Sequence, residues 1–287
     1  MHLLKDLYTI RGDLLVKKDT KITPRIVSRI REMGAKHKSA TVKLKDTGIF
    51  SDFRKVFRDA KYANILKSPT VNKEICEIAG KLEIEDDLVL ELNAMKSNIP
   101  YTYNHALIVA ALAIRLSLVY GPGRYDKYTT ARCGFTHDIG KTRIAVSILE
   151  KRKKLNAKER SMINTHTIMG YLLLCYYLKN DRTICPLANL DHHERPDGSG
   201  YPRGITKIGR YSRLISIVDI LDALMTKRPY RNKAFVLRAA LDYLLKQAYM
   251  KRFDINMILP LVSLARKENS DMHSIRISKE TRYEIPD

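Results

Sequence analysis

The chain has 287 residues, 45% of them hydrophobic, and its 52 Lys and Arg against 31 Asp and Glu give a formal net charge of +21. This length suits one large domain or two smaller ones, and this hydrophobic content supports a packed core, which excludes a chain disordered throughout. The positive charge favours anionic partners but says nothing about the fold. We find no nucleic-acid-binding motif and no interleaving of aromatic and basic residues. A solvated basic surface or a small phosphate ligand is therefore favoured over RNA or DNA.

Cysteine usage and hydropathy predict a cytoplasmic protein without a membrane span. The four cysteines form no C-x-x-C pair and suggest no disulfide framework, which is typical of reduced thiols in a cytosol. The first residues, MHLLKDLYTI, carry charges where a secretory leader needs an apolar core. The longest apolar run, residues 106–114, is too short to cross a membrane. Cys133 lies one helical turn before His137, where a buried core thiol is favoured over a metal ligand.

The N-terminal stretch predicts a small mixed module. Apolar and polar residues alternate around Arg11-Gly12-Asp13, which indicates two short strands joined by a turn. Thr23 as the cap, Pro24 as the first residue and Gly34 as the stop predict a helix. A third short strand is expected near residues 39–45. This module carries no catalytic constellation of its own, and three roles stay open: a regulatory element, a docking element for a protein partner, or a packing platform.

From Ile49 onward the apolar residues recur at helical spacing, and no long alternating strand pattern follows. Ser68 as a cap and Pro69 at the first position mark the start of one of these helices. The predicted helices cover residues 50–66, 68–82, 99–120, 129–140, 160–178, 213–225 and 235–250. We therefore predict a mainly α fold, with a helical bundle over residues 91–267, the mixed α/β module over 1–90 before it and a charged tail over 268–287 after it.

Histidines and aspartates in the helical part predict a metal centre. Five of the eight histidines lie in or beside helical stretches that are expected to be buried: His105, His137, His166, His192 and His193. Imidazole and carboxylate together suit iron, manganese or zinc. Asp138 directly follows His137 at a helix end, where its carboxylate could bridge two cations. Asp219 lies on an otherwise apolar helix and would be costly to bury unpaired, and Asp222, one turn later, is a natural partner of a ligand.

Two motifs carry a resemblance to a known family. FTHDIGK, around His137 and Asp138, resembles the signature of the HD superfamily of metal-dependent phosphohydrolases. HHERPDGSGYP, from His192 onward, resembles the second signature of its HD-GYP branch, and the resemblance covers roughly residues 95–265. Members of this branch are bacterial cyclic di-GMP phosphodiesterases. They have an all-helical HD-type domain with a two- or three-metal centre, often of iron.

The resemblance implies a role for particular residues. Asp138 would bridge two metals and be catalytic, and Lys141 would be a catalytic donor near the scissile phosphate. Substrate would also contact Tyr201, Arg228 and Arg231. The full implied ligand set is His105, His137, Asp138, His166, His192, His193 and Asp219.

The same resemblance bears on the number of metals. Three-metal members carry a glutamate four residues before the first ligand histidine, and this chain has Tyr101 there. A tyrosine is neutral near pH 7. We therefore predict two divalent ions, iron or alternatively manganese, rather than three.

The predicted reaction is hydrolysis of the phosphodiester bonds of cyclic di-GMP to linear pGpG by a metal-bound hydroxide, and whether hydrolysis continues to GMP is left open. Two cations about 3.5–4 Å apart can clamp phosphate oxygens and lower the pKa of a bound water. Three alternatives stay open: a non-hydrolysing cyclic-dinucleotide receptor on the same fold, a phosphohydrolase of another nucleotide, including a mixed cyclic dinucleotide, and a nucleic-acid-binding protein. A homodimer is also left open.

Three further features of the sequence have a functional and a structural interpretation. Glu194 and Asp197 are expected to form hydrogen bonds in the turn, behind the ligands, rather than to act in catalysis. Tyr201 either stacks on substrate or is a wall of the site. The KRKK run at residues 151–154 could guide an anionic substrate, but a solvated charge run is favoured.

Overall fold

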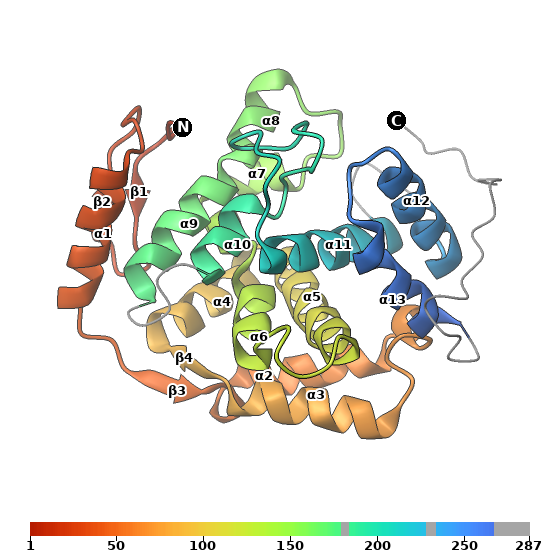
Figure 1. Ribbon diagram of the computed structural model, residues 1–287. Coiled ribbons are helices and arrows are strands. Elements are labelled where there is room, and N and C mark those ends of the chain that lie inside the picture. Colours follow the sequence, from red (N-terminus) through yellow and green to blue (C-terminus); the bar gives the residue numbers. More distant parts are fainter. Residues whose placement is uncertain (179–183, 228–233, 267–287) are drawn as a thin grey trace.

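The computed structural model describes residues 1–178, 184–227 and 234–266, and within these it is built mainly of helices (Figure 1). The mainly α fold predicted from the sequence is confirmed. The strands are β1 (Leu7–Tyr8), β2 (Leu14–Val16), β3 (Thr41–Lys43) and β4 (Glu83–Glu85). The α-helices are α1 (Pro24–Lys36), α2 (Gly48–Phe53), α3 (Pro69–Lys81), α4 (Asp86–Asn98), α5 (Pro100–Val119), α6 (Lys127–Thr136), α7 (Val146–Leu149), α8 (Ala157–Asn164), α9 (His166–Tyr177), α10 (Ile184–Asp191), α11 (Arg210–Met225), α12 (Leu237–Tyr249) and α13 (Ile255–Ala265). The 3₁₀ turns are η1 (Leu44–Asp46), η2 (Arg54–Arg58), η3 (Ala60–Tyr62) and η4 (Ile139–Arg143).

The N-terminal elements form largely as predicted. β1 and β2 pair antiparallel, and Gly12 in the turn between them has φ of +92°, which a residue with a Cβ rarely adopts. The Thr23 side chain caps α1 by accepting a hydrogen bond from the Ile26 amide. β3 pairs antiparallel with β4, a strand of three residues that is too short to show an alternating pattern in the sequence.

Four predicted boundaries were wrong. The helix predicted over residues 129–140 ends as α6 at Thr136, because Asp138 leaves the helical backbone with φ of −107° and ψ of 11° before η4 begins at Ile139. α1 does not stop at Gly34 but continues to Lys36, because Gly34 packs against the backbone of α9 instead of ending the helix. Residues 50–66 do not form one helix, since Asp59 is extended and its side chain accepts a hydrogen bond from the Lys61 amide, which separates η2 from η3. Residues 160–178 form two helices that meet at Thr165, so that His166 becomes the first residue of α9.

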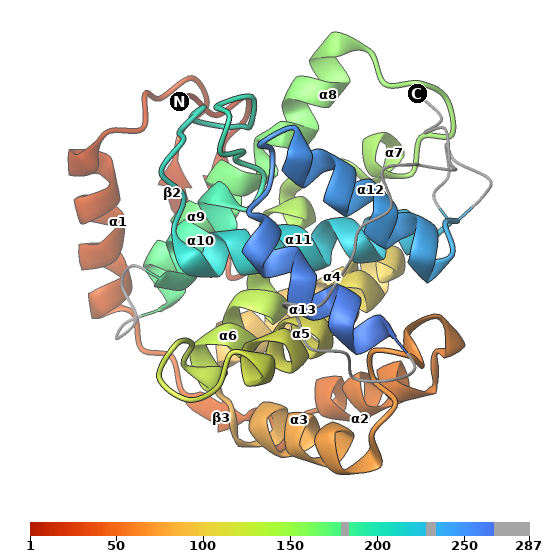
Figure 2. The same ribbon diagram turned by 45° about the vertical axis from the view of Figure 1, so that its right-hand side comes forward.

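The centre of the molecule is α5, which contacts α4, α6 and α11. By length and composition α5 could cross a membrane, but 78% of its most apolar window is buried inside the protein, as expected of a core helix. Both ribbon views place α1 at an outer edge and α2 and α3 along the bottom, and Figure 1 places α12 and α13 on the side away from α1 (Figures 1 and 2). α1 packs against α9, so the N-terminal strands and helix lie on the bundle rather than apart from it.

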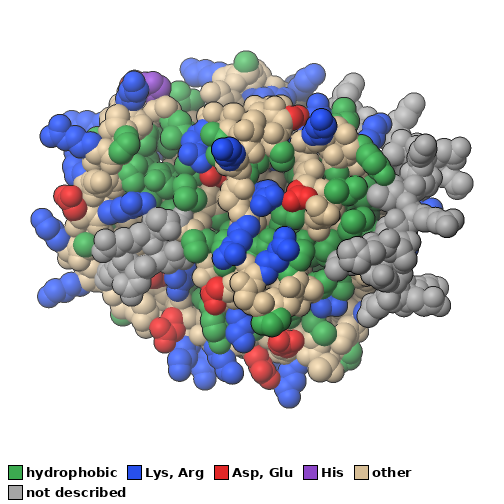
Figure 3. All heavy atoms as spheres, viewed as in Figure 1, with side chains coloured by type: hydrophobic (Ala, Val, Ile, Leu, Met, Phe, Trp, Pro, Cys, Tyr) green, Lys and Arg blue, Asp and Glu red, His purple; other side chains and the backbone are tan. Residues whose placement is uncertain are grey.

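The positive charge is spread over the face of the molecule that Figure 3 shows. The face drawn in Figure 3 shows Lys and Arg side chains around its margins and across its middle, with fewer acidic ones among them. A surface of this kind attracts anions in general without marking one path for a polynucleotide.

Candidate metal centre

Five helical elements bring the predicted ligands to one point in the middle of the bundle. His105 lies on α5, His137 and Asp138 follow the last residue of α6, and His166 begins α9. His192 and His193 follow α10, and Asp219 lies in the second half of α11. His193 has the most exposed side chain of the seven, at 19%, whereas that of Asp138 is 1% exposed. The centre is therefore enclosed and opens on the His193 side.

The first half of the cluster joins α5, α6 and α11. The Nε2 atom of His105 lies 3.0 Å from Oδ1 of Asp219 and 3.3 Å from Nε2 of His137. Oδ2 of Asp138 lies 3.5 Å from Nε2 of His137 and 3.7 Å from Nε2 of His105. Two imidazoles thus face Oδ2 of Asp138, and one of them, that of His105, also contacts the Asp219 carboxylate.

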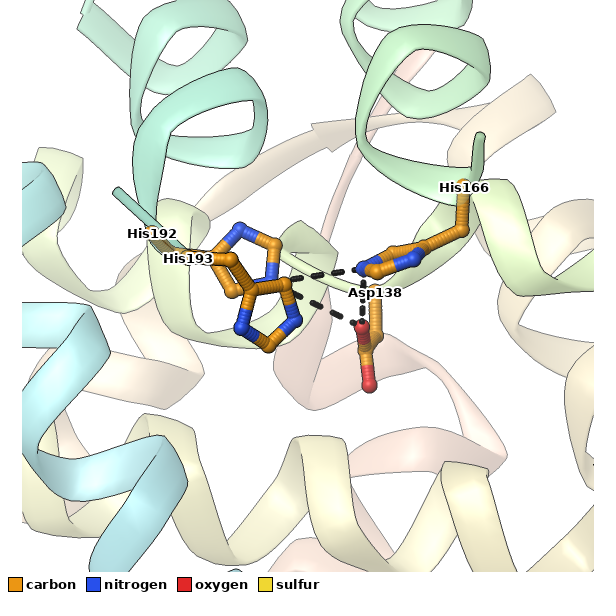
Figure 4. A group of neighbouring side chains, drawn as sticks. All are labelled: Asp138, His166, His192 and His193. Carbon is orange, nitrogen blue, oxygen red and sulfur yellow. Dashed lines mark hydrogen bonds and ion pairs between the residues drawn. The ribbon is translucent and has the colours of Figure 1, made fainter. Parts of the chain in front are cut away.

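The second half of the cluster uses the other oxygen of the same carboxylate (Figure 4). Oδ1 of Asp138 lies 3.3 Å from Nε2 of His166 and 3.8 Å from Nε2 of His192. Figure 4 shows His166 entering from α9 and His192 and His193 from the opposite side, with Asp138 between them. Asp138 therefore presents one oxygen to each half, which is the arrangement that a bridging carboxylate needs.

The hydrogen bonds of the imidazoles decide which ring nitrogens face the centre. The Nδ1 atoms of His137, His166 and His192 lie 2.9, 2.7 and 2.6 Å from the carbonyl oxygens of Gly134, Ile163 and Asn189. A carbonyl oxygen only accepts, so each Nδ1 carries the proton and each Nε2 presents a lone pair to the centre.

This donor set fits divalent cations. The Nε2 atoms of His166 and His192 both carry lone pairs and face one another at 3.5 Å, which is unfavourable unless something positive lies between them. Within the described part of the chain, the buried Oδ1 of Asp138 also accepts no hydrogen bond of ordinary geometry. Imidazole nitrogens held by outward hydrogen bonds, together with carboxylates, are the ligands expected of an iron, manganese or zinc site.

Burial sets the protonation of most of these groups. Burial, together with His137 and His166, lowers the pKa of His192 to about 3, and burial also holds the pKa of His193 well below its ordinary value. Burial alone would raise the pKa of Asp138, but the Lys141 ammonium and the adjoining histidines outweigh it and hold that pKa well below its usual range. At neutral pH His192 and His193 are therefore neutral imidazoles and Asp138 is an ionised carboxylate.

His105 differs from the other histidines because it contacts two carboxylates. Burial lowers its pKa, but hydrogen bonds to Asp219 and Asp222 outweigh burial and raise the pKa to about 9. A cation bound at Nε2 would displace that proton, so metal binding at this position releases a proton.

Two close backbone contacts bring the ligand-bearing segments together. A Cβ at Gly140 would lie 2.0 Å from the carbonyl oxygen of His166, so only glycine lets η4 press against the start of α9. A Cβ at Gly200 would lie 2.4 Å from the Cα of Glu194, so the turn after His193 also needs a glycine. The glycines of both motifs thus allow the segments that carry the candidate ligands to pack closely together.

The structure places the remaining predicted residues as follows. Nζ of Lys141 contacts Oδ2 of Asp138, and the Lys141 side chain is 15% exposed, on the open side. The Tyr201 ring stacks on His193 with centroids 4.7 Å apart and planes 24° apart. Tyr101 lies on α5 one turn before His105. Arg228 and Arg231 lie outside the described residues.

The turn residues behave as the structural interpretation predicted. Glu194 accepts hydrogen bonds from the amides of Arg203 and Ile205, and Asp197 accepts two from Ser199. In the KRKK run, Lys151 pairs with Glu159 and the next three residues are exposed, as in a solvated charge run. Cys133 is buried and lies against Cys185, so it is a core residue as predicted.

One contributor to the centre was missed by the sequence analysis. Asp222 contacts Nδ1 of His105, as expected of a partner, but it also accepts a hydrogen bond from the hydroxyl of Tyr62. Tyr62 lies in a stretch without a motif, and nothing in its local pattern distinguishes it from a core tyrosine.

Comparison with known proteins agrees with this geometry. Residues 89–257 match the family model described as HD domain, and the chain belongs to this family, as the motifs predicted.

Three relatives illustrate the similarity. Cyclic di-GMP phosphodiesterase PA4108 of Pseudomonas aeruginosa is 29% identical over 61% of this chain and 43% of its own length. 3'3'-cGAMP-specific phosphodiesterase 1 of Vibrio cholerae is 36% identical over 53% of this chain and 35% of its own. Cyclic di-GMP phosphodiesterase response regulator RpfG of Xanthomonas campestris is 40% identical over 39% of this chain and 30% of its own. The chain thus aligns with less than half of each relative.

Proposed function

We propose that this chain is a metal-dependent phosphodiesterase that hydrolyses cyclic di-GMP to linear pGpG, as the end product or on the way to GMP, in bacterial second-messenger signalling. The observation that carries the proposal is the convergence of inward-facing Nε2 atoms on the two oxygens of the Asp138 carboxylate. The two relatives that are named as cyclic di-GMP phosphodiesterases support the substrate class.

The ligand set suits two ions, for which we propose iron or manganese. When bound, two divalent cations would supply Lewis acidity toward phosphate oxygens and a water of lowered pKa. Asp138 and Asp219 bring two negative charges, fewer than the positive charge of two divalent ions, so the loaded site would stay positive and attract an anionic phosphate. A dinucleotide messenger as the substrate supports a cytoplasmic location.

The chain's own residues indicate how substrate would approach. His193 and Lys141 are the most exposed charged or ligating groups at the centre, with side chains 19% and 15% exposed. We place the scissile phosphate on this side, where the Lys141 ammonium can donate to an oxygen on which charge develops. Tyr201 stacks on His193 and would border the same opening. The reaction needs no serine or cysteine nucleophile.

A mixed cyclic dinucleotide is a second candidate substrate. It is favoured by the relative that is named as 3'3'-cGAMP-specific, which is 36% identical to this chain over 155 aligned residues. A receptor that binds the dinucleotide without hydrolysis is the remaining alternative, and the complete ligand set weighs against it.

Turnover of the metal-loaded protein tests the proposal. Protein loaded anaerobically with Fe²⁺, or with Mn²⁺, is incubated with cyclic di-GMP or 3'3'-cGAMP, and the products are separated by chromatography. We expect linear dinucleotide from cyclic di-GMP and two ions per chain by metal analysis. Tight binding without turnover would instead establish a receptor, and three tightly bound ions would contradict the two-metal site.

Substitution of the bridging carboxylate sharpens this test. Asp138→Ala should remove both ions and lower turnover by about 10³-fold or more, since metal catalysis contributes several kcal/mol. Asp197→Ala is the matched control, because Asp197 is an aspartate of the adjoining turn whose partners among the described residues are Ser199 and Arg252. Retained turnover in Asp138→Ala, or equal losses in both variants, would refute the role of Asp138.

A further inference from the structure

Tyr62 lies outside the family-matched region of the chain, and its hydroxyl contacts Asp222, which lies behind the candidate metal centre. It is the last residue of η3, its side chain is fully buried, and its hydroxyl donates a hydrogen bond to Oδ1 of Asp222. The family match begins at residue 89. The N-terminal part of the chain therefore supplies a polar group to the interior of the helical bundle.

Asp222 connects that hydroxyl to a ligand. It is fully buried on α11, one turn after Asp219, and its Oδ2 contacts Nδ1 of His105. Oδ1 also accepts a hydrogen bond of 3.1 Å from the Thr226 hydroxyl. Two donors thus occupy Oδ1 and leave Oδ2 to His105, which fixes the rotation of the carboxylate.

The orientation of His105 follows from this arrangement. An imidazole held at Nδ1 presents Nε2 along the opposite side of the ring, and Nε2 of His105 lies 3.0 Å from Asp219 and 3.3 Å from Nε2 of His137. A carboxylate free to rotate would let the ring turn out of this position. Groups that hold a ligand at its second nitrogen typically change metal affinity about 10- to 100-fold when they are removed.

The segment that carries Tyr62 is itself well fixed. Asp59 caps η3 by accepting from the Lys61 amide, and the carbonyl oxygen of Tyr62 accepts from the amides of Ile65 and Leu66 at 2.9 and 2.8 Å. The Lys61 ammonium also donates a hydrogen bond to the Thr226 hydroxyl at 3.2 Å. Two adjacent residues of η3, Lys61 and Tyr62, therefore contact the end of α11. A side chain on so constrained a turn can hold a partner precisely in place.

We propose that Tyr62 is a positioning residue of the metal centre, which acts through Asp222 on His105 and thereby makes cation affinity depend on the N-terminal part of the chain. This inference rests on the metal centre of the proposed function and is independent of which dinucleotide is the substrate. Tyr62 contacts neither substrate nor cation, so its effect is on the affinity for the ion and not on the chemistry of the fully loaded site.

Direct titration of the metal-free full-length chain with Mn²⁺ tests the inference without any substrate. Tyr62→Phe removes one oxygen and keeps the ring. We expect its dissociation constant for Mn²⁺ to rise about 10-fold, and excess Mn²⁺ to restore wild-type turnover. Thr226→Val removes the other donor to the same oxygen and should weaken Mn²⁺ binding in the same direction. If Tyr62→Phe does not fold, Thr226→Val still tests the role of the hydrogen bonds to Asp222.

Tyr177→Phe is the matched control. Its hydroxyl is also buried and donates to a buried carboxylate, that of Glu91, at 2.8 Å, but Glu91 contacts none of the proposed ligands in the described structure. Its melting temperature should fall without a change in Mn²⁺ affinity. An unchanged Mn²⁺ affinity in Tyr62→Phe, or equal losses of Mn²⁺ affinity in Tyr62→Phe and Tyr177→Phe, would overturn the positioning role of Tyr62. Either result would leave the proposed function standing. A wild-type chain that binds no Mn²⁺ or Fe²⁺ would overturn the metal centre, and with it the proposed function.

Discussion

The ring of Tyr201 lies on the imidazole of His193, the least enclosed ligand of the candidate centre. The two rings stack with centroids 4.7 Å apart, while the amide of Tyr201 donates to the carbonyl oxygen of His193 at 3.3 Å. Stacking of this kind contributes about 0.5–1.5 kcal/mol beyond burial. The tyrosine of the second motif therefore supports a ligand, whether or not it also touches substrate.

Substitutions at Tyr201 separate the two roles. Tyr201→Phe keeps the stack, so Mn²⁺ affinity should stay within about 2-fold of wild type, whereas Tyr201→Leu removes the ring and should weaken it about 10-fold. Calorimetric titration with Mn²⁺ measures both. An unchanged affinity in Tyr201→Leu, with a raised KM for the dinucleotide, would show that the ring serves substrate and not His193.

At the scale of single residues, the sequence predicted which histidines and aspartates come together, but only one of the residues that hold them from behind. His137, Asp138 and His192 were found because they lie in contiguous motifs, in which neighbours along the chain share one function. Asp222 was found because a second carboxylate on an apolar helix needs a partner. Tyr62 could not be found, since its contact with Asp222 spans 160 positions and depends on how η3 packs against α11.

The contact between α1 and α9 shows how one backbone approach decides the placement of an element. A Cβ at Gly34 would lie 2.1 Å from the carbonyl oxygen of Tyr176, and Gly34 is buried in the middle of this interface. The sequence predicted Gly34 as a helix stop because glycine commonly ends helices. Its function here is to allow two helices to touch, a reason that is visible only once α9 is in place.

Gly34→Ala tests this packing. The backbone of α9 cannot yield as a flexible side chain would, so α1 has to shift, and we expect a loss of about 2–3 kcal/mol in the free energy of unfolding. Gly48→Ala is the control, because Gly48 begins α2 with nothing within 4 Å of an added Cβ. It should be neutral or stabilise by up to about 1 kcal/mol. Urea denaturation followed by circular dichroism measures both, and equal stabilities would contradict a tight α1–α9 contact.

The elements themselves were largely predictable, whereas their breaks were not. The capping residues Thr23 and Ser68 predict the starts of α1 and α3, and the spacing of apolar residues predicts α5 and α11. The break at Thr165 lacks a proline or glycine and leaves the backbone close to helical, with φ of −67° and ψ of −12°. Local helix propensity hardly predicts such a break, although the break decides where His166 lies.

At the scale of the whole molecule, a buried ion pair joins the N-terminal hairpin to the segment that follows Asp138. Arg143 at the end of η4 forms a two-pronged contact with Glu91 of α4, including a bond of 2.8 Å, and also donates to the carbonyl oxygen of Tyr8. Tyr177 of α9 donates to Glu91 and accepts from the amide of Ile10. The fully buried carboxylate of Glu91 is thus contacted from η4 and α9, and the hairpin joins the same cluster through the backbone of Tyr8 and Ile10.

The buried contact between Glu91 and Arg143 leads to a quantitative prediction about the stability of the whole fold. Glu91→Gln keeps the shape but removes the charge opposite Arg143, whose side chain is only 13% exposed. An uncompensated buried charge costs about 3–5 kcal/mol, so we expect a loss of that size in the free energy of unfolding. Replacing both partners by apolar groups, as in Glu91→Leu with Arg143→Met, should recover most of the loss because no buried charge is then left unpaired. Urea denaturation of the three proteins measures this. A loss below about 1 kcal/mol in Glu91→Gln would mean that water reaches Arg143 and that the hairpin is held by its apolar contacts alone.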